Sequence, residues 1–391
     1  MRLLFVVDGR SPIALIWIRY FVERGDEVHL VSTFACQPDL DLASLTILPV
    51  AFSGLKARQP AGLTGKSRNP LWGSSMVRMR TWVRQWLGPL SLSSAARRMQ
   101  PLVERVRPDL IHAMRIPFEG MLASHIQDAT PLLISIWGND FTLHASATPW
   151  MGRLTRQALG AASAVHADCQ RDIRLAFEWG FPRQRPVTVL PGAGGIQLDV
   201  FHPTAEMSEA IHPPWVINPR GIRAYIRNEP FFKAIPLVLA QEPETQFICT
   251  GMAGQPQAEG WVRQHQVADN VQLLGLQTRQ QMAELFRRAQ VSVSPSVHDG
   301  TPNTLLEAMA CGTFPVAGDL ESLREWITPG VNGLLVDPDD PEALAKAILQ
   351  ALQQPDLRRQ ARKINTRLVE ERAEYGQVMH LAAGFYEQLV K

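Results

Sequence analysis

Short apolar runs alternate with helix-length amphipathic stretches along this 391-residue chain, and no other feature constrains its fold as strongly. Such alternation is typical of βα units, in which helices connect parallel strands. It predicts strands over residues 3–7, 27–32, 46–50, 109–113, 132–137 and 187–190 in the first half. The second half repeats the rhythm, with strands predicted over residues 215–217, 246–250, 271–274, 291–294, 314–317 and 333–336. We therefore expect an α/β protein with two doubly wound sheets.

The segment 201–214 separates the two sets of predicted strands, contains three prolines and shows little hydrophobic periodicity, which indicates a hinge. We expect residues 1–205 to form a first domain and residues 206–374 a second. A helix over residues 375–391 is expected to pack back on the first domain. Ligands of open α/β sheets bind beyond the carboxyl ends of the strands. Two such edges facing each other across a cleft would enclose a substrate from both sides.

The composition excludes several classes of protein. Apolar residues make up 46% of the chain and charged residues 19%, which is too apolar for a disordered protein. No run of about 18 uncharged apolar residues is present to cross a bilayer. The first apolar run ends at Asp8 and is too short for a secretory signal, so we expect a cytoplasmic protein. The four cysteines are far apart, which favours neither a metal site nor a disulfide framework.

The segment 294–312 carries the strongest local signal. A predicted strand ends at its start, Thr301 is a preferred N-cap residue, and Pro302 suits the first position of a helix. The pattern therefore predicts a helix that begins at Pro302 and stops before Gly312.

The amide groups at the start of that helix would lack helical acceptors, so they and the helix dipole form an anion site. Asp299 lies just before the helix and Glu307 lies inside it. Carboxylates accept hydrogen bonds from sugar hydroxyls, and a diphosphate between two sugars presents hydroxyls on both sides. The layout therefore matches a nucleoside diphosphate sugar. The alternative is that Asp299 forms a turn and Glu307 faces solvent.

The spacing from Asp299 to Glu307, followed by Ala-Met-Ala-Cys-Gly, resembles the Glu-x7-Glu signature of family-four retaining glycosyltransferases, which have the GT-B fold of two Rossmann-like domains. The resemblance implies that Asp299 contacts the donor sugar and that Glu307 binds the nucleotide ribose. This chain departs from the signature at Asp299, which is one methylene shorter than Glu. The resemblance also implies donor-binding roles for Gly300, Thr301, Pro302, Asn303, Thr304 and Leu305.

A diphosphate in this cleft calls for fixed cations, and arginine is its natural bidentate partner. Arg220, Arg223 and Arg227 follow the first strand of the second half. Arg220 and Arg227 resemble the two basic residues with which the family holds the diphosphate, and Arg223 is a substitute for either. The alternative is a solvated loop. By the same resemblance, Gly251 allows close approach of a ligand, and Leu276 lies where the family contacts the nucleobase.

The turn after the first strand lacks the Gly-x-Gly-x-x-Gly pattern, which disfavours a nicotinamide-dependent enzyme. In the resembled family this loop approaches the donor phosphate and the acceptor. Gly9, Arg10 and Ser11 are therefore candidate binding residues.

Residues 134–140 resemble the family's His-Gly-x-Asp segment, with Trp137 in the histidine position. An indole cannot accept a hydrogen bond, so the polar contact would fall to Asn139, Asp140 or His144. Asp140 is the catalytic candidate among them, and the alternative is that it caps a helix. We expect His166 to be a packed core residue.

The segment 56–107 is strongly basic: it holds eleven Lys or Arg residues against the single acid Glu104, a charge of +10 that leaves −8 for the remainder. Its apolar stripe, formed by Met76, Met79, Val83 and Trp86 with Trp82 adjoining, and its flanking arginines, Arg78, Arg80 and Arg84, suit the interface of an anionic membrane. The alternative is that the stripe packs on the first domain. No nucleic-acid-binding module accompanies the charge.

These observations together favour a retaining glycosyltransferase, specifically a hexosyltransferase, without cofactor or metal. Its donor would be a nucleoside diphosphate sugar, with UDP favoured and GDP or ADP as alternatives. The acceptor hydroxyl would belong to a lipid-linked acceptor, a polysaccharide or another glycoconjugate at the inner face of the membrane. Asp299, Arg220, Arg227 and Asp140 would carry the chemistry. Two alternatives are a nucleotide-sugar epimerase or hydrolase, and a non-catalytic nucleotide-sugar sensor.

Overall fold

The computed structural model describes residues 1–51, 82–204 and 213–391, which form two compact units. Unit 1 comprises Met1–Gly194 and Gln377–Lys391, and unit 2 comprises Gly195–Gly376. The division after Gly194 comes earlier than residue 205, where the proline-rich segment places it. Within the described residues, no helix combines the length and apolarity needed to span a bilayer.

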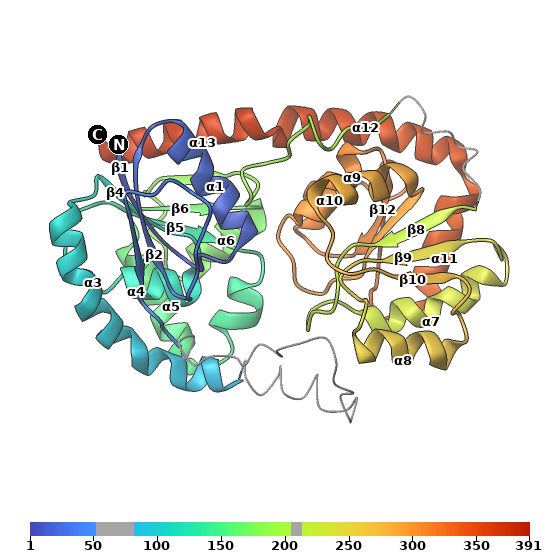
Figure 1. Cartoon of the computed structure of the whole chain (residues 1–391), viewed down its shortest axis with the longest axis horizontal. Helices are drawn as coiled ribbons and strands as arrows, with labels where there is room; N and C mark the ends of the chain where they lie inside the picture. Colours follow the sequence, from blue (N-terminus) through green and yellow to red (C-terminus); the bar gives the residue numbers. More distant parts are fainter. Residues whose placement is uncertain (52–81, 205–212) are drawn as a thin grey trace. The chain divides into compact units, whose positions relative to one another are not determined.

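Unit 1 contains a seven-stranded parallel sheet with the order β3-β2-β1-β4-β5-β6-β7 (Figure 1). Its strands are β1 (Arg2–Val7), β2 (Glu27–Ser32), β3 (Ser44–Ile47), β4 (Leu110–Ala113), β5 (Leu132–Ile136), β6 (Ala164–Ala167) and β7 (Val187–Val189). Its helical segments are α1 (Pro12–Glu23), η1 (Gly88–Ser91), α3 (Leu92–Val106), η2 (Ile116–Gly120), α4 (Met121–Ala123), η3 (Asp140–Ala145), α5 (Pro149–Ala161) and α6 (Gln170–Glu178). The sequence pattern predicted every strand except β6, whose Ala-Val-His-Ala sequence is too short and weakly apolar to stand out.

Unit 2 contains a six-stranded parallel sheet with the order β10-β9-β8-β11-β12-β13. Its strands are β8 (Trp215–Asn218), β9 (Gln246–Cys249), β10 (Val271–Leu273), β11 (Val291–Ser294), β12 (Phe314–Gly318) and β13 (Leu334–Val336). Its helices are α7 (Asn228–Leu239), α8 (Pro256–His265), α9 (Arg279–Arg288), α10 (Asn303–Ala310), η4 (Leu323–Glu325), α11 (Pro341–Gln353) and α12 (Pro355–Ala373). All six predicted strands of this half are present.

Both sheets reverse their winding once. In unit 1 the chain adds β2 and β3 on one side of β1, and then places β4 on the other side. In unit 2 it adds β9 and β10 on one side of β8, and then places β11 on the other side. Ligands of doubly wound sheets bind beyond the carboxyl ends of the strands at such a switch point. The topology therefore marks one site between β1 and β4 and another between β8 and β11.

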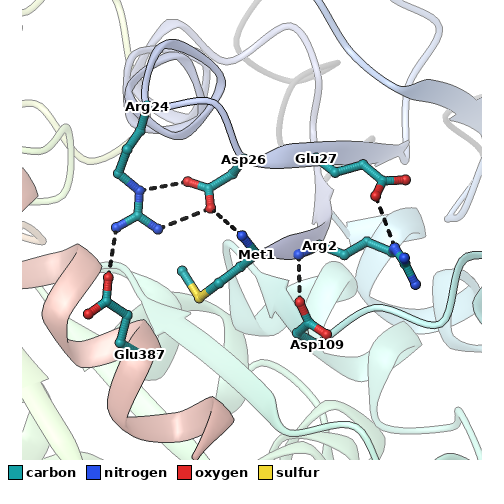
Figure 2. A network of polar contacts seen from close by, with 7 residues as sticks. All are labelled: Met1, Arg2, Arg24, Asp26, Glu27, Asp109 and Glu387. Atoms are coloured by element: carbon teal, nitrogen blue, oxygen red, sulfur yellow. Dashed lines mark hydrogen bonds and ion pairs between the residues drawn. The ribbon is translucent and has the colours of Figure 1, made fainter.

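The C-terminal helix α13 (Tyr375–Val390) continues from unit 2 into unit 1, and an ionic network fastens its end there (Figure 2). Asp26 accepts hydrogen bonds from the Met1 amino group at 2.7 Å and from the Arg24 guanidinium at 2.7 and 3.1 Å. Arg24 also donates to Glu387 on α13 at 3.2 Å. The chain's first residue and its last helix are therefore held by one shared arginine–aspartate pair.

A fully buried chain of hydrogen bonds crosses the sheet of unit 1 and reaches α13 through Tyr386. Trp17 Nε1 donates to the Tyr386 hydroxyl at 2.9 Å, and that hydroxyl lies 2.5 Å from His112 Nδ1. His112 Nε2 lies 2.7 Å from Ser135 Oγ, which lies 2.8 Å from His166 Nδ1. The chain ends at the Leu190 carbonyl, 2.8 Å from His166 Nε2.

The carbonyl at the end fixes the direction of every bond in this chain. Leu190 O can only accept, so His166 Nε2 carries a hydrogen and His166 Nδ1 accepts from Ser135. Ser135 must then accept from His112, whose Nδ1 accepts from Tyr386. These directions require neutral imidazoles, and burial lowers the pKa of His112 well below its usual value and that of His166 to about 4. His166 is the packed core residue that the sequence predicted.

Candidate active site

The switch point of unit 2 lies where β8 and β11 end and where α10 begins. Helix α10 starts at Asn303 with Pro302 as its N-cap, so the predicted cap at Thr301 is wrong by one residue. The Thr301 hydroxyl accepts a hydrogen bond from Trp326 Nε1 at 3.0 Å instead of capping the helix. Gly312, with φ of +83°, ends the helix as predicted.

The first turn of α10 offers two backbone donors. Leu305 N–H donates to Pro302 O at 3.0 Å, so the expectation that Leu305 is also available is wrong. The N–H groups of Asn303 and Thr304 donate to no acceptor among the described residues. Unsatisfied amides and the positive end of the helix dipole make this turn an anion site.

Arg220 reaches the same turn from the loop after β8. Its Nη1 donates to Thr304 Oγ1 at 3.0 Å, and its Nη2 donates to Asp299 Oδ2 at 2.7 Å. Its Nε is buried and has no partner within the described parts of the chain. Two buried asparagines hold the loop: Asn218 accepts from the Arg220 amide, and Asn228 donates to Gly221 O. The structure therefore presents Arg220 as a rigid cation with one unused donor.

Asp299 forms an ion pair with Arg220 in this arrangement. The resemblance assigns Asp299 to the donor sugar, whereas its Oδ2 is engaged by the guanidinium and its backbone carbonyl accepts from Ser322 Oγ at 2.7 Å. The shorter aspartate side chain is thus held beside the cation at the start of α10.

Glu307 lies one turn further along α10 and is half-buried. Burial raises the pKa of its carboxyl group to about 7, and the positive charges of Arg279 and Arg220 oppose this shift. No described residue donates a hydrogen bond to its side chain. A poised carboxylate without a protein partner is available for a ligand hydroxyl.

Arg279, the first residue of α9, is a member of this site that the sequence reasoning missed. A capping box between Thr278 and Gln281 fixes the helix start. Arg279 Nε is buried and lacks a partner among the described residues, and the guanidinium acts electrostatically on Glu307. Its position just after the predicted nucleobase-contacting stretch was the signal that could have identified it.

The other two predicted cations of unit 2 do not join Arg220. Arg227 Nε donates to Asp339 at 2.7 Å in an exposed ion pair, and Arg223 donates to the Tyr225 hydroxyl at 2.9 Å. Arg227 is the N-cap residue of α7, and its guanidinium reaches Asp339 in the segment before α11. The spacing of the arginines along the sequence could not show this contact.

Gly251 and Leu276 lie together at the edge of the same sheet. Gly251 has φ of +67°, and a Cβ there would lie 3.5 Å from Gly221 Cα. The left-handed backbone conformation favours glycine at position 251, where close approach of a ligand is predicted. The Leu276 side chain is 95% exposed, as a surface for a nucleobase would need.

The predicted residues of unit 1 are mostly engaged by the protein itself. The Gly9 amide donates to Ser32 Oγ at 3.0 Å. Ser11 is the N-cap of α1 and accepts from Ala14. These contacts shape the loop after β1 and leave backbone geometry as the main contribution of Gly9 and Ser11.

Asp140, for which a catalytic role is predicted, braces two loops of unit 1. It is fully buried, pairs with Arg115 at 2.9 Å, and accepts from the amides of Ile116 and Trp137 at 3.2 Å. Burial raises its pKa to about 6, and the Arg115 charge opposes that shift. Asn139 accepts from the same Arg115 at 2.7 Å. These bonds join the loop after β4 to the loop after β5, which leaves Asp140 out of solvent reach.

Trp137 occupies the predicted position but has no polar group to offer. Its Nε1 donates to the Met114 carbonyl, and a Cβ at Gly192 would lie 2.7 Å from its ring. His144 Nδ1 lies 3.5 Å from Gln85 Nε2.

One cluster in unit 1 brings possible metal ligands together among the described residues: Asp168, Cys169 and Asp172 have ligand atoms within 4.8 Å of one another. The Arg171 guanidinium forms an ion pair with Asp172 at 2.8 Å, and burial raises the pKa of the Cys169 thiol. A buried cation and a protonated thiol suit a structural ion pair better than a metal.

The fold agrees with solved glycosyltransferase structures. Sucrose-phosphate synthase from Thermosynechococcus elongatus is similar over 100% of this chain and 99% of its own, with a TM-score of 0.74 and 19% identity. The Anabaena protein HepE in complex with UDP and glucose is similar over 99% of this chain and 100% of its own, with a TM-score of 0.69 and 16% identity. The two α/β units thus define a GT-B fold.

Sequence comparison places the chain in a family. Residues 11–192 match the glycosyl transferase 4-like domain, and residues 225–354 match the glycosyl transferases group 1. The chain therefore belongs to the group 1, family-four type of glycosyltransferases.

Curated relatives match over part of their length. A D-inositol 3-phosphate glycosyltransferase from Thermobispora bispora is 26% identical over 217 residues, which cover 51% of this chain and 50% of the relative. The O-antigen chain mannosyltransferase B of Escherichia coli is 36% identical over 95 residues, which cover 24% of this chain and 22% of the relative.

Proposed function

We propose that this glycosyltransferase transfers a hexose, with retention of anomeric configuration, from a nucleoside diphosphate sugar to a hydroxyl acceptor. The observation that carries the proposal is the buried Arg220: its Nε, like the amides of Asn303 and Thr304, has no partner among the described residues. A diphosphate offers these donors the charge-assisted acceptors that they lack. Complexes of similar structures with UDP support UDP as the nucleotide.

The same groups supply the chemistry of the leaving group. Negative charge develops on the diphosphate as the bond to the sugar breaks. Arg220 and the start of α10 lie where they stabilise that charge without reorganising. Glu307 accepts from the ribose hydroxyls, and Asp299 keeps Arg220 in place.

We further propose that the acceptor is presented at an anionic membrane surface as a lipid-linked glycan, a polysaccharide or another glycoconjugate. The described end of the basic segment exposes Trp82 (57%), Trp86 (44%) and Leu90 (63%). Interfacial aromatic side chains next to basic residues bind such surfaces. Met76, Met79, Arg78 and Arg80 lie outside the described residues. Arg84 was expected beside the stripe, but its side chain instead lies over Phe34 and Phe118.

The test is nucleotide release from UDP-, GDP- and ADP-sugars by the full chain, with and without membrane lipid extract. We expect release from one donor class to rise with extract, and proton NMR of the product to show the donor's anomeric configuration. Inversion would overturn retention. Release that ignores acceptor would favour a hydrolase or an epimerase, and binding without release would favour a sensor.

A further inference from the structure

The switch point of unit 1, between β1 and β4, holds two charged side chains with unmade hydrogen bonds. Glu119, in η2 after β4, is 3% exposed, and its Oε1 accepts from Thr33 Oγ1 at 2.6 Å. Its Oε2 is buried without a partner in the described part of the chain, and so is Arg84 Nε. The Arg84 guanidinium lies 5.2 Å from the ring centre of Phe34 and 4.9 Å from that of Phe118.

The other charges at this edge are already matched. Arg10 donates twice to Asp8 at 2.9 Å, and Arg115 pairs with buried Asp140 at 2.9 Å. These two arginines therefore need no further anion.

Arg84 and Glu119 stand apart from those pairs. Burial lowers the pKa of Arg84, and the Glu119 charge opposes that shift, so the two groups are near enough to interact electrostatically. As far as the described residues show, they form no ion pair with each other. One cation and one anion, each with an open position, leave the site neutral.

The chemistry of the two open positions selects the ligand. Glu119 Oε2 needs a donor and Arg84 Nε needs an acceptor, and a hydroxyl group is both at once. A phosphate would satisfy Arg84 but repel Glu119, and an amine would do the reverse. A doubly wound sheet binds its ligand at this point of reversed strand order.

We propose that Arg84 and Glu119 form a subsite for a hydroxyl group of a neutral polyol ring, a sugar or a cyclitol, that belongs to the acceptor. The inference rests on the proposed transfer function and adds the acceptor's chemical class. Thr33 orients the carboxylate so that Oε2 faces the incoming hydroxyl. A bound water that merely bridges the two side chains is the competing structural explanation.

The test measures binding of myo-inositol to the full chain by saturation-transfer NMR, in the wild type and in Glu119→Gln and Arg84→Met. We expect each substitution to weaken inositol binding roughly tenfold, the effect of losing one hydrogen bond to a charged group. Thr33→Val, which only frees the carboxylate to rotate, should weaken it less. Glu178→Gln, at an exposed carboxylate, is the matched control and should bind like the wild type.

UDP binding, measured on the same samples, distinguishes failure of the acceptor subsite from failure of the proposed transfer function. An unchanged melting temperature and circular dichroism spectrum show that each variant is folded, and unchanged UDP affinity shows that the donor site in unit 2 is intact. Wild-type protein that binds UDP but not myo-inositol, or variants that bind myo-inositol equally well, would overturn the subsite and leave the donor proposal standing. Absence of UDP binding in the wild type would overturn the proposed function itself.

Discussion

Arg220 Nη2 donates to Asp299 Oδ2 at 2.7 Å, across the ends of two adjacent strands in the sheet of unit 2. The two side chains are only 6% and 13% exposed. A buried guanidinium without a counter-charge is costly, so Asp299 fixes both the position and the charge balance of Arg220. A diphosphate would offer this arginine a second anionic partner.

Asp299→Asn should destabilise unit 2, because it leaves the Arg220 charge buried without its anion. We expect a loss of about 2–4 kcal/mol in the free energy of unfolding. UDP should raise the melting temperature of this variant more than that of the wild type, since the diphosphate replaces the missing charge. Calorimetry with and without UDP measures both effects; equal UDP shifts in the two proteins would count against the role of Asp299.

The pH dependence of donor binding should reflect ionisation of the Glu307 carboxyl group. Its pKa is about 7 in the folded protein, and only the ionised carboxylate accepts hydrogen bonds from both ribose hydroxyls. Donor affinity should therefore increase as the pH rises through about 7. Titrations of UDP between pH 6 and 8.5 would show this, and Glu307→Gln should remove the dependence. A slope that persists in Glu307→Gln would assign the titration to another group.

Arg227→Ala should change donor affinity little. The Arg227–Asp339 pair is exposed at 35% and 58%, and exposed pairs contribute about 0–1 kcal/mol. We expect the dissociation constant for UDP to change by less than about threefold. A loss as large as that from an Arg220 substitution would restore Arg227 to the diphosphate site.

Tyr386→Phe should loosen α13 from unit 1. The change leaves Trp17 Nε1 and His112 Nδ1 buried without partners, at a cost of about 1–3 kcal/mol. Thermal unfolding monitored by circular dichroism would measure it, with Tyr225→Phe, at a half-buried tyrosine of unit 2, as the control. An unchanged melting temperature would contradict the role of Tyr386 in the buried chain of hydrogen bonds.

Lowering the pH should reduce the free energy of unfolding through His166, a member of the same chain of hydrogen bonds. The pKa of His166 is about 4 in the folded protein and near its usual 6.5 in the unfolded chain, because burial disfavours the charged form. The stabilisation is complete above pH 6.5 and decreases as the pH falls from 6.5 towards 4, since only the unfolded state gains the proton in that window. Urea unfolding at pH 7 and pH 5 would test this, and equal free energies would contradict it.

The fold was largely predictable because parallel strands buried on both faces read as continuous apolar runs. β6 was missed since His166 interrupts its run, and only the partners of that imidazole explain its burial. The ends of strands were predictable from the sequence, so Arg220, Asp299 and Glu307 were found. Contacts among these side chains depend on how far each one reaches across the sheet, and no sequence pattern shows these contacts.

Two predicted residues bind partners that the local sequence does not show. Thr301 was expected to cap α10 from local preference, but a tryptophan indole elsewhere in unit 2 binds its hydroxyl. Asp140 is predicted to act on substrate, and in this structure Arg115 and two backbone amides bind its carboxylate. In each case a distant residue in sequence supplied the stronger partner. Arg84 and Glu119, which lie in separate segments, are brought near each other only by the fold.

The most direct test of the diphosphate site is a calorimetric titration of UDP into the full chain, comparing the wild type with Arg220→Gln. The glutamine keeps a polar group beside Asp299 but removes the charge and the Nε donor. We expect a dissociation constant at least about tenfold higher in the variant, from the loss of charge-assisted hydrogen bonds. Equal UDP affinity in Arg220→Gln and the wild type would contradict it.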